Sequence, residues 1–337
     1  MKPKGLKRKF WLKYNAYFAM QHILGYEKFN KVFGQKQSLL FKKIDSDLAD
    51  SNFSKNEEIP RLDASIVDKG ELDNYRKLLQ KPVLFKGAAK DWDCTKKWTL
   101  DFFQDEFGDI DVHILDTIGA IDPNNQQKYE VITLKEYINQ LKNGSLKYLK
   151  FSSLVQDKMK LQEDLRLNWL KKFQTLGSFG ARFYMFIGGK GTITPLHNEF
   201  SSVVYVQVHG RKKWILYAPN DRLYLDARTE RKHYFYTPAN PTNLEDKEHP
   251  LLKYGTKYEI TLEPGDVLWF PVFAWHYVEN LDDSIGVAYK FTNIADSFKA
   301  SKMLSMLYFL STKPNVFVNA IAMRLSKNHA DTRSAHG

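Results

Sequence analysis

The feature that most constrains the fold of this sequence is a series of short apolar segments between residues 182 and 291. They are rich in Val, Ile and aromatic residues, which are the residue types that favour β-strands. The segments are residues 182–187, 203–208, 213–217, 258–262, 267–270 and 285–291. Glycine or proline lies between several of them, as at Gly188, Gly210 and Pro264, and these residues are typical of turns. Many short strands joined by such turns predict a sandwich or barrel, a class that includes jelly rolls.

Helical patterns flank this β-rich region, so the expected fold class is mainly β with flanking helices. Apolar residues recur at spacings of three, four and seven over residues 6–33, and apolar faces return over 296–325. Pro314 is expected to divide the second segment into two helices, which are candidates for a dimer interface. Residues 221–257 are polar and lack periodicity, so we expect a long insertion loop near the mouth of the site.

The positive charge of the chain is concentrated at its N-terminal end. The formal net charge is +11, and residues 1–43 hold eleven Lys or Arg residues against a single acid, Glu27. The rest of the chain is nearly neutral, which argues against a generally basic, nucleic-acid-binding main domain. We predict a basic amphipathic arm over residues 1–43, a polar linker over 44–58, a main domain over 59–295 and C-terminal helices over 296–337.

Two interpretations of the arm remain open. A basic, aromatic helix can lie on an anionic membrane, and it can also contact RNA or an acidic protein. Surface helices normally bury one apolar stripe, however, so docking of the arm on the main domain is favoured. Lys13, Asn15 and Gln21 interrupt its apolar residues, so neither a signal peptide nor a membrane-spanning helix is expected. The predicted location is cytoplasmic, with peripheral membrane contact as an option.

Histidine and glutamate residues give the strongest functional signal. His197 and Glu199 are two residues apart, and residues at i and i+2 of a strand point to the same face. His276 follows the segment 264–271 and can complete the set from another strand. Two histidines and one carboxylate form the facial triad of non-haem Fe(II) oxygenases. The only cysteine, Cys94, excludes a cysteine cluster for zinc.

Each of these residues also has a structural interpretation. A histidine considered singly is usually an ordinary polar residue, and Glu199 could be a surface residue beside a structural histidine. His209 is a rival ligand, because strand alternation could aim it inward. The pattern as a set therefore carries the metal hypothesis, and no single residue does.

The motifs together resemble those of the cupin-like branch of the Jumonji-C Fe(II)/2-oxoglutarate oxygenases. The resemblance runs from about residue 59 to residue 291 and is strongest in 186–219 and 263–280. It rests on the order Gly-x-x-Gly-x-x-Thr-Pro-x-His, then Gln-Val-x-Gly-x-Lys, then Pro-Gly-Asp-x-x-x-x-Pro and Trp-His. Within the family, the motifs resemble those of the asparaginyl hydroxylase that acts on the hypoxia-inducible factor. The resemblance implies a double-stranded β-helix, which is a cupin-like jelly roll.

The resemblance also implies roles for individual residues. The Fe(II) ligands would be His197, Glu199 and His276. The far carboxylate of 2-oxoglutarate would bind Lys212, with Thr194 and Tyr148 completing that pocket. A lysine and two hydroxyls would satisfy a buried carboxylate that is otherwise costly to desolvate.

Three positions depart from the family pattern. The usual carboxylate is aspartate, whereas Glu199 is one methylene longer and ligates only if the backbone or the metal shifts. Val203 and Lys290 stand where the similar hydroxylase has two asparagines. Lys290 is therefore either a second anion anchor or a residue that alters substrate choice.

The sequence leads to an enzyme hypothesis and to an alternative. The first is a dioxygenase that uses Fe(II) and 2-oxoglutarate as co-substrate to hydroxylate a protein side chain or a small molecule. The alternative is a non-catalytic, metal-binding interaction module that keeps the cupin frame. A metal cupin isomerase or dioxygenase that works without 2-oxoglutarate is disfavoured, because those proteins usually present His-x-His where this chain has Glu199 in the second position.

Overall fold

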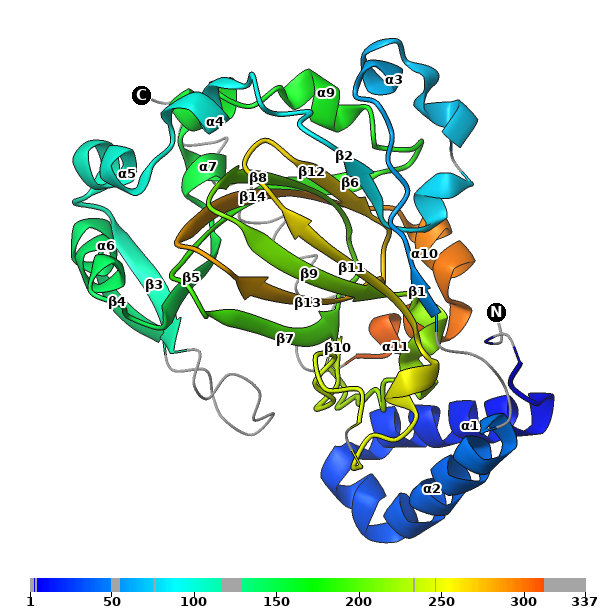
Figure 1. Cartoon of the computed structure of the whole chain (residues 1–337). Helices are drawn as coiled ribbons and strands as arrows, with labels where there is room; N and C mark the ends of the chain where they lie inside the picture. The colour runs from blue at the N-terminus through cyan, green and yellow to red at the C-terminus, as the bar shows by residue number, and fades with distance from the viewer. Residues whose placement is uncertain are drawn as a thin grey trace, which may run out of the picture.

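Two β-sheets face each other at the centre of the computed structural model (Figure 1). The structure describes residues 3, 5–49, 55–75, 77–116, 129–232, 234–245 and 247–311. We call the sheets sheet I and sheet II. Their strands include every segment that the sequence predicted to be a strand between residues 182 and 291.

Sheet I contains the strands that carry His197 and His276. Its strand order is β1 (Lys55–Glu57), β11 (Thr256–Leu262), β9 (Lys212–Tyr217), β13 (Trp275–Asn280), β7 (Ile193–Asn198) and β10 (Phe235–Tyr236). The pairs from β11 to β10 are antiparallel, whereas β1 runs parallel to β11.

Sheet II lies opposite and is extended at one edge. Its order is β2 (Val83–Phe85), β12 (Val267–Phe270), β8 (Ser202–His209), β14 (Ser284–Thr292), β6 (Phe179–Gly188), β5 (Lys147–Ser152), β3 (Asp111–Asp116) and β4 (Tyr129–Thr133). Two facing sheets, antiparallel apart from the edge strand β1, with flanking helices confirm the predicted jelly roll of mainly β class.

Strand β8 shows why the sequences of the central strands are continuous runs of apolar residues. Val203 and Tyr205 point into the cluster between the two sheets. Val204 and Val206 point the other way, into a cluster under the helices. Because both faces of the strand are buried, alternation of polar and apolar residues is absent.

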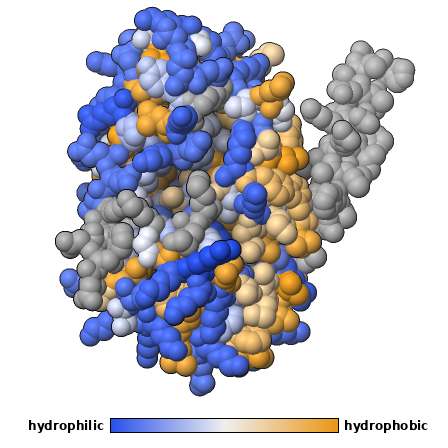
Figure 2. All heavy atoms as spheres, turned by 90° about the vertical axis from the view of Figure 1, so that its right-hand side faces the viewer, coloured by the Kyte–Doolittle hydropathy of each residue, from blue (hydrophilic) through white to orange (hydrophobic). Residues whose placement is uncertain are grey.

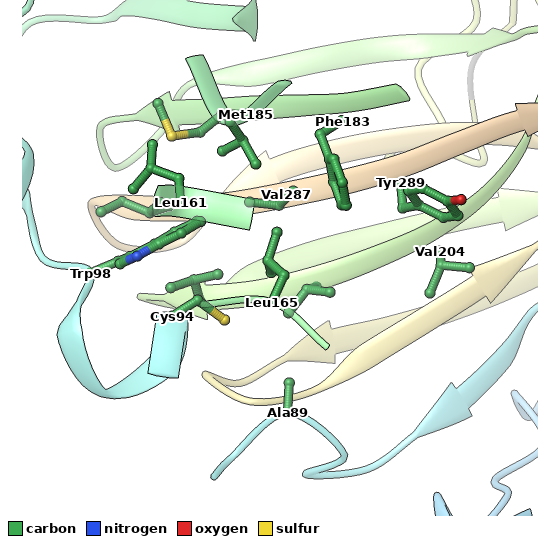
Figure 3. Packing of buried hydrophobic residues seen from close by; sticks show 14 of the residues in the cluster. Ala89, Cys94, Trp98, Leu161, Leu165, Phe183, Met185, Val204, Val287 and Tyr289 are labelled. Atoms are coloured by element: carbon green, nitrogen blue, oxygen red, sulfur yellow. The ribbon is translucent and has the colours of Figure 1, made fainter. Parts of the chain in front are cut away.

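Short helices cover the outer face of sheet II. They are α3 (Ser65–Asp68), α4 (Asp93–Lys97), α5 (Leu100–Phe107), α6 (Leu134–Lys142), α7 (Leu154–Asp157), α8 (Met159–Glu163) and α9 (Leu167–Lys171). Figure 3 shows Phe183, Val287 and Tyr289 from the sheet packing in one cluster with Trp98 and Leu161 from this cover. These residues are buried, so this cluster fixes the strands of sheet II that border the site.

The N-terminal residues form a helical hairpin, which differs from the predicted arm and linker. Helix α1 (Arg8–Leu24) ends at Gly25, and helix α2 (Tyr26–Leu48) follows at once. Gly25 has a φ of 84°, a conformation that glycine adopts without strain. The single helix over 6–33 was therefore wrong. The polar linker over 44–58 was wrong at both ends, because Ile44 and Leu48 are buried helical residues and β1 pairs with β11.

The hairpin docks on the main domain, as favoured from the sequence. Tyr14 and Phe18 are fully buried. The Tyr14 hydroxyl donates to the carbonyl of Arg222 at 3.0 Å, and the backbone N–H of Thr229 donates to the side chain of Gln21 at 2.9 Å. The contact is therefore both apolar and hydrogen-bonded.

The segment 221–257 lies against this hairpin. Leu223, Leu225 and Phe235 are fully buried and pack in one cluster with the hairpin and the outer side of sheet I. Among the residues that the structure describes, none of this segment lines the site cavity described below. The prediction of a plain loop was wrong, because the segment contains β10 and buries its apolar side chains under the hairpin. It does reach the site at one point, where Tyr236 of β10 pairs with His197 of β7.

Two short helices follow the last strand. Helix α10 (Ile294–Ala300) and helix α11 (Lys302–Phe309) meet at Ser301, whose hydroxyl accepts from the backbone N–H of Leu304 and caps α11. The break at Pro314 lies outside the described residues, and the dimer interface stays a prediction. In the described part of the chain, no helix combines the length and apolar character needed to cross a membrane.

Candidate functional site

One cavity between the two sheets brings together every predicted site residue. Its lining includes His197, Glu199, His276, Tyr148, Thr194, Lys212 and Lys290. The residues come from β7, β13 and β9 of sheet I and from β5 and β14 of sheet II, with Glu199 following β7 directly. Residues far apart in the sequence therefore meet because the jelly roll folds the two sheets over each other.

The two histidines are direct cross-strand partners. His197 on β7 and His276 on β13 are opposite each other in the register, and their ring centroids are 4.2 Å apart. The Nδ1 atom of His197 lies 2.8 Å from the carbonyl oxygen of Pro195, and Nδ1 of His276 lies 3.1 Å from that of Ala274. A carbonyl can only accept, so Nδ1 carries the proton and Nε2 keeps the lone pair. This is the tautomer in which Nε2 binds a metal.

Burial keeps both rings in the neutral form. Burial lowers the pKa of His197, although the nearby Glu199 carboxylate opposes the shift. Burial also lowers the pKa of His276 well below its usual value, and the neighbouring His197 adds to the shift. A neutral imidazole is the form that can donate an electron pair to a metal ion.

The carboxylate of Glu199 has a different partner. The Nζ atom of Lys290 lies 2.7 Å from Oε1 and 2.8 Å from Oε2 of Glu199. Within the described residues, no three His, Cys, Asp or Glu side chains are grouped so as to hold a metal ion. The histidine pair therefore fits a metal, whereas the third ligand is held by a lysine, and the complete triad stays a prediction.

The Lys212 side chain lies in a pocket of hydroxyl groups. Its Nζ donates to the Tyr205 hydroxyl at 2.7 Å and to the Tyr148 hydroxyl at 3.3 Å. Thr194 forms a side-chain hydrogen bond with Tyr148. Burial, together with the charge of Lys150, lowers the pKa of Lys212 to about 7. A buried cation among hydroxyls is suited to hold a carboxylate.

Several residues of this region were not predicted from the sequence, and Tyr205, Lys150 and Phe151 stand out among them. Tyr205 is the nearer partner of Lys212. The Lys150 ammonium reaches the carbonyl of Ile193 at 3.1 Å, and burial lowers its pKa to about 7. Phe151 lines the cavity and has a φ of 57°, which is unusual for a bulky residue. Lys150 could have been found, because it lies two residues after Tyr148 on a strand.

Other candidates take no part in the site. His209 ends β8 and is not among the described residues that line the cavity. Cys94 is buried in the core under sheet II, and burial raises the pKa of its thiol to about 12, so it is no nucleophile. Val203 and Lys290 are register partners on β8 and β14 and both line the cavity.

Comparison with known proteins identifies the family. The cupin-like domain family matches residues 71–297 of this chain, which is more than half of it. The chain belongs to the cupin-like domain family. Its relatives place it among the Jumonji-C proteins, whose members generally use Fe(II) and 2-oxoglutarate.

The curated relatives support this placement. Lysine-specific demethylase 8 of Xenopus tropicalis is 25% identical over 288 residues, which cover 78% of this chain and 62% of that protein. HSPB1-associated protein 1 of Homo sapiens is 33% identical over 138 residues, or 40% of this chain and 28% of that protein. JmjC domain-containing protein A of Dictyostelium discoideum is 25% identical over 244 residues, or 66% of this chain and 94% of that protein. The chain thus spans about three fifths of the first of these relatives.

Proposed function

We propose that this protein is a hydroxylase that uses Fe(II) and 2-oxoglutarate and acts on a protein side chain or a small molecule. The observation that carries the proposal is the cross-strand pair His197 and His276, with both Nδ1 atoms bonded to carbonyls. Two fixed, neutral imidazoles with free lone pairs in one cavity are suited to a divalent metal. When bound, iron would supply the activation of oxygen.

The residues of the chain would perform the remaining tasks. Lys212 would bind the distal carboxylate of 2-oxoglutarate, and the hydroxyls of Tyr148 and Thr194 would complete that pocket. The aromatic residues Phe186 and Trp214 line the same cavity and would exclude water from it. The shape of the cavity supports these separate roles, because the histidine pair and the Lys212 pocket line the same space between the sheets.

Metal and co-substrate binding test the proposal directly. Fe(II) is titrated anaerobically into the wild-type protein, His197→Ala and His276→Ala, followed by 2-oxoglutarate and then air, with succinate measured. We expect one Fe(II) per chain in the wild type, loss in each variant and formation of succinate. Undiminished metal in both variants contradicts the site. Comparing products in cells with and without the protein would then identify the substrate.

The Glu199–Lys290 pair favours a second candidate function. A carboxylate held by an internal ammonium is compatible with an interaction module that keeps the cupin frame without catalysis. Succinate formation separates the two functions. A protein that binds 2-oxoglutarate but forms no succinate with any candidate substrate would be the module.

A further inference from the structure

The Glu199–Lys290 pair is built into the fold and does not depend on flexible surface chains. Lys290 lies near the C-terminal end of β14, paired with Arg182 on β6 and with Val203 on β8. The backbone of Glu199 is fixed as well, since its carbonyl accepts from the N–H of Phe273 at 3.0 Å. Both backbones are held by neighbouring chain segments, so only side-chain rotation can separate the two charges.

Aromatic rings hold the Lys290 ammonium in place. Its Nζ lies 4.7 Å from the ring centroid of Phe151, 5.5 Å from that of Tyr184 and 6.0 Å from that of Phe186. A cation near several ring faces is attracted by their quadrupoles, most strongly where water is excluded. The lysine side chain is 9% exposed, and Glu199 is 21% exposed. The cage and the carboxylate therefore act on the same ammonium.

One ammonium engages both oxygens of the carboxylate that the sequence pattern assigns to the metal. A metal ion that binds Glu199 must share the carboxylate with Lys290, and the two cations would then lie close together and repel each other in a low-dielectric interior. The histidines carry no such conflict. Each uses Nδ1 for its hydrogen bond to a backbone carbonyl, which leaves Nε2 to face a metal ion. The two cations compete for one ligand.

We propose that Lys290 is an internal competitor of the metal ion, which holds Glu199 away from the His197–His276 pair and so sets the affinity of the site. This inference rests on the proposed function, because it concerns the same metal. It also explains two of the three departures from the family pattern together. The longer glutamate and the lysine at position 290 form a matched pair that other members with aspartate and asparagine would not form.

Metal titration of Lys290→Met tests this inference. Methionine removes the charge and keeps most of the length that packs in the aromatic cage. Co(II), which resists oxidation, serves as the probe and is followed by its visible absorption and by calorimetry. We expect Lys290→Met and Lys290→Gln to bind Co(II) at least tenfold more tightly than the wild type, and Lys290→Arg to show no gain. Circular dichroism checks that each variant is folded.

Two controls separate competition from a general charge effect. Lys150→Met also removes a buried cation near the site but none that contacts Glu199, so we expect less than a threefold gain. In the Glu199→Ala background, Lys290→Met should give no gain, because the ligand that it releases is absent. An equal gain in Lys150→Met or in the Glu199→Ala background overturns the inference.

The possible results distinguish this inference from the proposed function. Wild-type binding that depends on His197 and His276, with unchanged affinity in both Lys290→Met and Lys290→Gln, overturns the competition and leaves the metal site intact. Absence of Co(II) binding in the wild type and in every folded variant overturns both.

Discussion

Lysine is used in opposite ways in the site cavity and on the N-terminal hairpin. In the cavity, Lys212 and Lys290 are buried and each has specific partners, namely tyrosine hydroxyls and a carboxylate. In this buried cavity the local dielectric is low, so each hydrogen bond or ion pair of a lysine contributes strongly by itself. Loss of one cavity lysine is therefore expected to change the chemistry of the site.

On the hairpin, lysines act as a group. Lys9, Lys13, Lys36 and Lys43 are exposed and line an open groove of about 550 Å³ between α1 and α2. Figure 2 shows hydrophilic side chains with apolar ones between them on the lower part of the face where the hairpin lies. Exposed charges are screened by salt, so only their sum can attract an anionic partner. The position of a lysine in the fold therefore decides whether it acts through specific partners or through its share of a summed charge.

The largest effect is expected from the apolar contacts of the hairpin, not from its charges. Phe18 is fully buried and its ring centroid lies 5.9 Å from that of Phe235. We expect Phe18→Ala to lower the free energy of unfolding by roughly 3–5 kcal/mol. The matched control Leu12→Ala, at a residue that is 57% exposed, should change it by less than about 0.5 kcal/mol. Urea unfolding measures both, and equal values for the two variants would show that the hairpin is not anchored as described.

The next effect separates the two groups of lysines. Lys212→Ala removes the buried cation expected to face the distal carboxylate of 2-oxoglutarate, and breaking such a pair costs roughly 3–5 kcal/mol. We expect the affinity for 2-oxoglutarate to fall by two or more decades while metal binding persists. Lys36→Ala on the hairpin should leave the affinity for 2-oxoglutarate unchanged. If Lys212→Ala also leaves the titration unchanged, Lys290 becomes the candidate anchor.

A pH series tests the electrostatic difference more finely. Burial lowers the pKa of Lys212 and of Lys150 to about 7, so both lose their charge as the pH rises above 7. Binding of a carboxylate requires a charged lysine, so above pH 7 a neutral lysine must take up a proton when 2-oxoglutarate binds. For each lysine that does so, the affinity should fall by about tenfold per pH unit above 7. Below pH 6 it should level off. Calorimetry in buffers of different ionisation enthalpy counts the protons, and a constant affinity from pH 6 to 9 contradicts the prediction.

The smallest effect on stability is expected from the hairpin charges. Reversal of the groove pair, Lys13→Glu with Lys36→Glu, should abolish salt-sensitive association with anionic vesicles, RNA or an acidic peptide. The pair Lys28→Glu with Lys42→Glu lies outside the groove and is the control for net charge. Both double variants should stay within about 1 kcal/mol of the wild type in urea unfolding. Equal loss of association in both pairs would show that net charge matters and the groove does not.

The sequence was most informative about strands and about the chemistry of the site. Apolar β-rich segments such as 203–208 and 267–270 identified strands to within a residue or two, because strands buried on both faces exclude polar residues. The motif order also selected the residues that line the cavity. It was less informative about the hairpin, where an isolated glycine within a helical pattern, Gly25, does not by itself signal a break.

By itself, then, the sequence determined a β-rich sandwich or barrel, the concentration of charge before residue 44 and the residue types of the site, because these follow from local composition and spacing. The jelly roll in particular was what the family resemblance implied. Only the tertiary structure decided that Lys290 holds Glu199, that Lys150 lies near Lys212, and that the segment 221–257 packs under the hairpin. Each of these depends on contacts between residues tens to hundreds of positions apart. Such contacts are selected by which apolar surfaces pack together and which buried charges find partners, and no local pattern in the chain records that choice.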